Sequence, residues 1–548
     1  MAPPVNRRNL LKTGVAGASA LATGTRLPSA LAQSTPTATT SGSPAVDIYP
    51  GDRVGPDDPR YQTLVRGYNQ RWVGTPAYVH LCGDTAQVAR AVQRAVDDGL
   101  RITVRGGGHC YEDFVSNNDG GVIIDLTPMR RVWRDRETGW YGIEGGATLW
   151  DVYWQLYREF GVTLPGGSCA SVGVGGHIPG GGHGVMSRMY GLAADQLHAV
   201  EVVHVTSDGR AEVITVSRDA PNADEEDLMW GHSGGGGGNF GIVTRFFFRE
   251  LPQAPRESRI FAHAFDWSAL DQPTFTRLVQ NFGEFMAANS DVDSPYKSMY
   301  FQLLLSQKAA GQVVLTAHDT DPNPDRMVAM IEAVEAGMPE PQKATLTVGP
   351  HNTSQHPTAG RTLPWLYAMQ TYNGVGPNEY SKYKSAYMRK AFPDDQIEIM
   401  YEHLAHPDHP NANALIQVEP YGCQINAIDP AATAVAQRSS IMLLQYQTYW
   451  TDPADADDNL EWIRSFYTAM YGEDGPMPDD VMDGCYINYC DADLKNWPAL
   501  YYKDNYPRLQ RVKARWDPLN IFNHAQSIAL PAKGSDATTP AASPVATP

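Results

Sequence analysis

Two side chains able to bond covalently to an electrophile stand in glycine-dense stretches of this sequence. His109 ends the run 104–109, which reads VRGGGH, and Cys169 stands near the start of the run 165–184, which reads PGGSCASVGVGGHIPGGGHG. Glycine lets the backbone approach a ligand closely, and successive exposed N–H groups form a cradle for an anion. Two such cradles, each with one nucleophilic side chain, suit a cofactor that carries a pyrophosphate and an electrophilic ring.

Other ligands explain these loops less well. Neither run contains the Gly-Lys-Ser/Thr of a P-loop, and the glycine spacing is not the Rossmann fingerprint. The spacing of His177, His183, His198 and His204 matches no zinc pattern, so we expect no metal site. A solitary histidine or cysteine is usually a packing residue, so the interpretation depends on several segments that agree.

The elements that must position the first loop alternate between helix and strand. Asp84 or Thr85 can cap a helix that ends at Gly99, and residues 101–105 then form a strand that runs into the loop of His109. Residues 121–126 indicate a second buried strand, and 147–160 a second helix closed by Gly161. Such alternation places ligand loops at strand ends.

A third glycine element lies at 227–244, which reads DLMWGHSGGGGGNFGIVT. Five successive glycines could form a flexible linker, but here they precede a strand at 242–248, which favours a loop packed against a ligand. From about residue 256 the pattern predicts a mostly antiparallel sheet with intervening helices at 275–288 and 460–470. Its strands are expected at 260–265, 300–305, 312–318, 415–421 and 441–450.

Taken together, these segments resemble the berberine-bridge-enzyme family within the vanillyl-alcohol-oxidase flavoproteins. The segment 379–390 is similar to bacterial members of the aclacinomycin-oxidoreductase type, and 501–527 matches the family's terminal module. The resemblance implies an α+β fold, with a split, two-subdomain PCMH-type FAD-binding domain at 60–255. It also implies a substrate domain at 256–500, with an antiparallel sheet covered by helices, and a berberine-bridge module at 501–532 that returns to the FAD domain.

The resemblance also implies FAD held by two covalent links, from His109 to C8α and from Cys169 to C6 of the flavin. The other residues expected to contact the cofactor are Arg105, Gly106, Gly107, Gly108, Val172, Gly173, Gly175, Gly176, His177, Gly181, Gly182, Ile242, Val243, Asn520 and Phe522.

Candidate catalytic residues follow from the same resemblance. Tyr489, in the family's Tyr-x-Asn-Tyr element at 486–489, is expected to be the base, although most of the 27 tyrosines must be packing residues. Because the reference pKa of tyrosine is about 10, we expect the site to stabilise the phenolate. Gln445 is expected to orient the substrate hydroxyl or the tyrosine, unless it is a sheet residue that faces solvent. Val172 occupies the position that gates oxygen, where a small branched residue favours an oxidase.

The function implied is oxidation of a secondary alcohol, of a sugar or glycoside, by hydride transfer to flavin N5 with O2 reduced to hydrogen peroxide. Two alternatives stay open: aromatic or alkaloid-type C–H oxidation or cyclisation on the same scaffold, and a flavin-carrying binding protein without turnover.

The N-terminus predicts export. Arg7 and Arg8, a small-residue apolar stretch and an Ala-x-Ala triplet at 30–32 are typical of a twin-arginine signal peptide over 1–32, with the twin-arginine translocase as partner. Biased Thr/Ser/Pro/Ala segments indicate a disordered linker at 33–50 and a disordered tail at 533–548. A net charge of −18 argues against nucleic acid or an anionic membrane as partner. Six cysteines are too few for a disulfide scaffold.

Overall fold

The computed structural model describes residues 51–339, 346–347, 360–371 and 378–532. The predicted signal peptide 1–32, linker 33–50 and tail 533–548 lie outside the described residues. Within the described ranges, no helix combines the length and apolar character needed to cross a bilayer.

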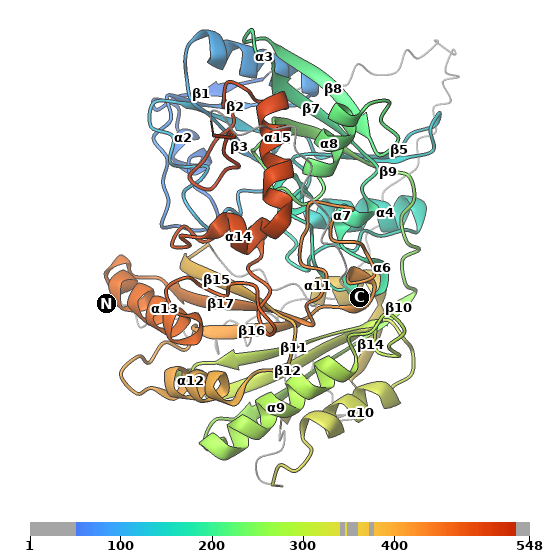
Figure 1. Cartoon of the computed structure of the whole chain (residues 1–548), viewed down its shortest axis with the longest axis vertical. Helices are drawn as coiled ribbons and strands as arrows, with labels where there is room; N and C mark the ends of the chain where they lie inside the picture. Colours follow the sequence, from blue (N-terminus) through green and yellow to red (C-terminus); the bar gives the residue numbers. More distant parts are fainter. Residues whose placement is uncertain (1–50, 340–345, 348–359, 372–377, 533–548) are drawn as a thin grey trace, which may run out of the picture.

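The N-terminal half of the chain forms two sheets (Figure 1). The first has the order β1-β2-β4-β3, with β4 parallel to both β2 and β3. The second is antiparallel, in the order β5-β6-β9-β7-β8. The strands are β1 Arg53–Val54, β2 Tyr78–Leu81, β3 Ile102–Arg105, β4 Val122–Asp125, β5 Val132–Arg134, β6 Tyr141–Glu144, β7 Ala199–Val205, β8 Ala211–Ser217 and β9 Ile242–Phe248.

The two predicted helices of this half are confirmed and show how the loops are held. Helix α3 (Thr85–Asp97) begins at Asp84, whose side chain accepts a hydrogen bond from the Gln87 N–H. Its apolar face packs in one core with strands of both sheets. Helix α4 (Leu149–Phe160) begins with a capping box of Thr148 and Asp151 and ends at Gly161 in the left-handed conformation. The remaining helices of this half are α2 Tyr61–Leu64, α5 Val174–His177, α6 Ser187–Tyr190, α7 Ala193–Gln196 and α8 Ala223–Gly231.

The following part of the chain forms an eight-stranded antiparallel sheet. The antiparallel sheet and five of its strands were predicted; the other three strands, 346–347, 361–364 and 380–388, were not. Its order is β13-β10-β12-β11-β16-β17-β15, with β14 also paired to β10. Helices α9, α10, α12 and α13 lie on the side of this sheet away from the N-terminal half or along its edge (Figure 1). The strands are β10 Glu257–Asp266, β11 Met299–Ser306, β12 Gln312–Asp319, β13 Leu346–Thr347, β14 Arg361–Pro364, β15 Tyr380–Met388, β16 Leu415–Pro420 and β17 Met442–Trp450; the helices are α9 Gln272–Ala288, α10 Asp325–Val334, α11 Trp365–Thr371, α12 Asp394–Ala405 and α13 Ala456–Tyr471.

The last described segment returns to the N-terminal half. After α14 (Trp497–Tyr502), helix α15 (Tyr506–Trp516) packs along α8. The buried Lys513 ammonium donates to the backbone carbonyls of Asn239, at 2.8 Å, and Phe522, at 2.6 Å. Phe522 also forms a parallel bridge with Ile102 of β3. The chain end is thereby fixed beside the strand that leads to His109.

Candidate active site

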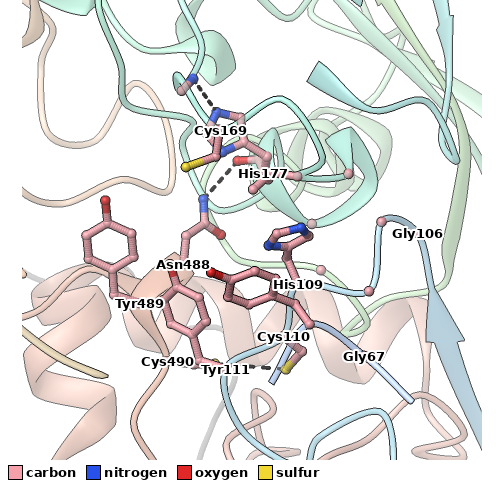
Figure 2. A pocket seen from close by; sticks show the side chains of 18 of the residues that line it. Gly67, Gly106, His109, Cys110, Tyr111, Cys169, His177, Asn488, Tyr489 and Cys490 are labelled. Carbon is pink, nitrogen blue, oxygen red and sulfur yellow. Dashed lines mark hydrogen bonds between the residues drawn. The ribbon is translucent and has the colours of Figure 1, made fainter. Parts of the chain in front are cut away.

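A cavity of about 700 Å3 lies where the glycine loops of the N-terminal half meet the eight-stranded sheet. Figure 2 shows His109, Cys169 and Tyr489 around this space. Most of the predicted site residues line it: Arg105, Gly106, Gly107, Gly108, His109, Cys169, Val172, Gly173, Gly175, Gly176, His177, Ile242, Val243, Gln445, Tyr489 and Phe522.

Three residues expected to contact the cofactor do not line this cavity: Gly181, Gly182 and Asn520. Gly182 contributes instead to the structure around the site, because its N–H donates a hydrogen bond to the Tyr486 hydroxyl at 3.1 Å. Asn520 adopts a positive φ of 52° in the turn after α15, four residues from the buried Trp516. The glycine-rich pattern and the terminal motif located these residues near the site but could not show which of them face inward.

The two glycine loops pack backbone against backbone. A Cβ atom added to Gly107 would lie 2.3 Å from the Gly173 nitrogen, and one added to Gly173 would lie 2.1 Å from the Gly107 nitrogen. These positions therefore require glycine for close approach rather than for flexibility. The contact sets the loop of His109 directly against the loop of Cys169.

His109 is held with its ring oriented. Its Nε2 atom is 2.8 Å from the Ser171 hydroxyl, and the Tyr68 ring stacks on it with centroids 4.4 Å apart. Burial lowers the pKa of His109 to about 4, so the imidazole is neutral near pH 7. With Nε2 engaged by Ser171, a neutral ring can present Nδ1 as a nucleophile.

The cavity fits a large polar cofactor. His232 lines it, and neither of its ring nitrogens has a hydrogen-bond partner among the described residues. A buried polar group without a partner is costly, so such nitrogens indicate that a ligand completes the site. The third glycine element, predicted to pack against a ligand, contributes Gly236, Gly237 and Gly238 to the same lining. FAD, with its pyrophosphate and polar ring edges, matches these features.

Tyr489 is placed by the segment around it. The Asn488 amide donates to the His177 carbonyl and to the Tyr486 hydroxyl, both at 2.9 Å (Figure 2 shows the first). The Tyr486 hydroxyl in turn accepts from the His183 N–H at 3.2 Å. The Tyr-x-Asn-Tyr element is thus fastened to the loop that follows Cys169.

The neighbour of the Tyr489 hydroxyl is a carboxylate that the sequence reasoning missed. The hydroxyl donates to Oε1 of Glu419 at 3.3 Å, and the other carboxylate oxygen of Glu419 is 3.1 Å from His183 Nδ1. Burial, with the Glu419 charge, raises the pKa of Tyr489 well above its usual value. The expectation that protein groups around Tyr489 stabilise its phenolate is therefore wrong: the residues of the chain favour the neutral phenol. The only feature of the sequence that could have pointed to Glu419 as a site residue was its position, as an acidic residue, at the end of an apolar strand.

Gln445 belongs to a group of glutamines on the cavity side of the large sheet. Its amide donates to the Tyr111 hydroxyl at 3.1 Å, and Gln447 donates to its carbonyl oxygen at 2.8 Å. Gln417 on β16 stands opposite Gln445 in the strand register, and Gln302 on β11 lines the same space. Because Gln445 is only 5% exposed and lines the cavity, the alternative of a solvent-facing sheet residue is wrong.

Comparisons with known proteins agree with this architecture. Residues 76–215 match the family model for an FAD binding domain, and 485–529 match the model "Berberine and berberine like". The aclacinomycin-N/aclacinomycin-A oxidase of Streptomyces galilaeus is 41% identical, over 88% of this chain and 89% of its own length. The chain belongs to the berberine-bridge-enzyme-like family of FAD-linked oxidoreductases.

Two further similar proteins are named oxidases. The hexose oxidase of Chondrus crispus is 36% identical, over 88% of this chain and 95% of its own length. The crystal structure of a glycopeptide hexose oxidase complexed with teicoplanin has 40% identity and a TM-score of 0.80, over 87% of this chain and 99% of that one. The protein is an FAD-dependent oxidase of this family, and its fold is the PCMH-type fold.

Proposed function

We propose that this oxidase acts on a secondary alcohol of a sugar or glycoside and passes the electrons to O2, with hydrogen peroxide as product. The observation that carries the proposal is one shared cavity. The Tyr489–Glu419 pair and the glutamines of the large sheet face the same space as His109 and Cys169. Glutamine amides and tyrosine hydroxyls both donate and accept hydrogen bonds, which suits a ligand with many hydroxyl groups. The relatives named above as hexose and aclacinomycin oxidases support the same substrate class.

In such a reaction, different residues of the chain would move the proton and orient the substrate. FAD, when bound, supplies the acceptor for the hydride. The Tyr489 oxygen accepts the proton of the substrate hydroxyl while its own proton moves along the hydrogen bond to Glu419. Because a relay of this kind needs no free phenolate, it is compatible with the raised pKa of Tyr489. Gln445, fixed by Gln447 and Tyr111, is placed to orient the hydroxyl.

The substrate class is tested by measuring hydrogen peroxide with a panel of free hexoses, sugar-bearing glycosides, their sugar-free aglycones and aromatic or alkaloid substrates. We expect peroxide from sugar-bearing compounds and none from the matching aglycones. Turnover confined to aromatic or alkaloid substrates would favour C–H oxidation on this scaffold. A flavin that none of these compounds reduces would favour a binding protein and contradict the proposal.

We further propose that His109 and Cys169 both bond to the flavin. Both line the cavity, on loops that touch through Gly107 and Gly173. We expect His109→Ala and Cys169→Ala each to keep flavin after acid precipitation, and the double variant to release all of it. Mass spectra of tryptic peptides should show flavin on both sites of the parent. Complete release of flavin from the parent protein by acid would contradict the proposal.

Oxygen as acceptor has a further support in Val172. This small residue lines the cavity, and its N–H donates to the Cys169 carbonyl at 3.2 Å. It therefore leaves room beside the proposed cysteine link, where a bulkier side chain would restrict access of O2 to the flavin.

We also propose export through the twin-arginine translocase, because this route carries folded proteins and a flavin bonded to two loops requires a folded chain. We expect the Arg7→Lys/Arg8→Lys variant to accumulate as flavin-loaded precursor in the cytoplasm. The Lys12→Arg variant, which keeps the pair, should be exported normally. Fractionation followed by in-gel flavin fluorescence measures both. Undiminished export of the paired lysine variant would contradict this route.

A further inference from the structure

Two cysteines that the proposed chemistry does not use meet in the wall of the cavity. Cys110 directly follows His109, Cys490 directly follows Tyr489, and their sulfur atoms are 3.9 Å apart although 380 residues separate them in the chain. Figure 2 shows this contact below the ring of Tyr111. None of the six cysteines, all of which are in the described part of the chain, forms a disulfide.

A buried ionic cluster holds the two cysteine-bearing segments in fixed register. The Lys382 ammonium of β15 binds Glu112, two residues after Cys110, at 2.5 Å and Asp491, the residue after Cys490, at 2.6 Å. All three side chains are almost fully buried. The N–H of Ala492 also donates to Glu112 at 3.3 Å. The sulfur atoms are therefore brought together by contacts on both sides and not by one flexible loop.

We propose that Cys110 and Cys490 are a redox-active pair that closes to a disulfide and so ties the loop of the proposed flavin-linked histidine to the segment of the proposed base. A disulfide bond is about 2.05 Å long, so the two sulfur atoms, now 3.9 Å apart, must move closer for the bond to form. The bond would join the two halves of the site covalently. The formation of this disulfide can be tested with added peroxide, so the test does not depend on the proposed oxidase activity.

The local environment assigns different roles to the two thiols. Hydrogen bonds from the Cys490 thiol and from the backbone N–H groups of Glu112 and Phe114 lower the pKa of Cys110. The hydrogen bond with Cys110, together with burial, raises the pKa of Cys490. A thiolate is the nucleophile in thiol oxidation, so Cys110 reacts first and Cys490 resolves.

Hydrogen peroxide is the oxidant in this scheme. The Cys110 thiolate attacks one peroxide oxygen, the O–O bond breaks, and the departing hydroxide takes a proton to become water, which leaves a sulfenic acid. The Cys490 sulfur then attacks the Cys110 sulfur, forms the S–S bond and displaces the second oxygen as water. The two thiols lose two electrons and two protons in total, and peroxide gains them as two molecules of water.

The test treats the purified holoprotein with added hydrogen peroxide, blocks remaining thiols with N-ethylmaleimide under denaturing conditions, and maps tryptic peptides by mass spectrometry. We expect a linked pair of peptides that contain Cys110 and Cys490, which disappears after dithiothreitol. Cys110→Ser and Cys490→Ser should each abolish the linked pair. Cys82→Ser, in the separate core around α3, should keep it. Full alkylation of both cysteines in peroxide-treated parent protein would overturn the proposal, and this result needs no variant.

Thermal unfolding tests separately whether the Cys110–Cys490 disulfide holds the two segments together. We expect the cross-linked parent to have a Tm several degrees above that of the dithiol form, because the bond restrains the unfolded chain over a very long loop. The same treatment should leave the Tm of Cys490→Ser unchanged. A cross-linked protein no more resistant to heat than the dithiol form would contradict the role in holding the site together.

Discussion

Replacement of Tyr489 by phenylalanine is expected to slow reduction of the flavin by substrate roughly 10²- to 10⁴-fold, the usual cost of losing a general base. Tyr489→Phe keeps the ring and its packing on Tyr486 but removes the oxygen that is 3.3 Å from Glu419. Stopped-flow absorbance under anaerobic conditions measures this step alone. Reoxidation by O2 should be nearly unchanged, because it does not use the substrate hydroxyl.

Two further variants distinguish proton transfer from general damage to the protein. Tyr446→Phe also removes a buried hydroxyl, one bonded to Tyr471, but Tyr446 does not line the cavity, so its flavin should be reduced at the parent rate. Glu419→Gln keeps a hydrogen-bond acceptor for the Tyr489 hydroxyl but cannot take its proton, so it should slow reduction by a factor comparable to that of Tyr489→Phe. Reduction of Tyr489→Phe at the parent rate would refute the assignment of the base.

Replacement of Gly107 by alanine is expected to abolish stable flavin incorporation. The added methyl group would overlap the Gly173 backbone at 2.3 Å, and backbone cannot rotate away as a side chain can. Overpacking of this kind typically costs about 1–3 kcal/mol, and here it also separates the loops that carry His109 and Cys169. The ratio of flavin to protein absorbance, together with the Tm, measures both effects.

Gly55→Ala is the matched control for this substitution. A Cβ at Gly55 has its nearest neighbour, the Ala77 carbonyl oxygen, at 3.8 Å, which is ordinary van der Waals contact. Its flavin content and Tm should equal those of the parent. Full flavin loading of Gly107→Ala would show that the loops tolerate separation and that their contact is not required.

The sequence predicted the parts of this site that depend on local patterns. Capping residues and apolar periodicity located helices α3 and α4 within two residues. Alternation located strands β10, β11, β12, β16 and β17 of the large sheet, but β13, β14 and β15 were not predicted. The glycine density around His109 and Cys169 indicated close backbone approach, which the packing of Gly107 on Gly173 explains.

What the sequence could not show depends on contacts between distant segments. Glu419 meets Tyr489 across 70 residues, and nothing near either residue in the sequence points to the other. The expectation of a stabilised phenolate failed for this reason, since it considered the tyrosine without its partner. Gly181 and Gly182 share the glycine pattern of their loop but serve the Tyr486 hydroxyl and the local turn rather than the cavity wall.

The attachment of Asn488 to His177, which spans 311 residues, has a consequence for biosynthesis. The glycine loops are translated well before the segments at 488–522 that hold them in the folded chain. The tyrosine that would make the protein reactive arrives only near the end of synthesis, and the buried Lys513 that anchors the chain end arrives later still. A nascent or C-terminally truncated chain therefore contains the cofactor-binding loops but lacks both the proposed base and the residues that fasten those loops. Catalytic competence is coupled to completion of the polypeptide.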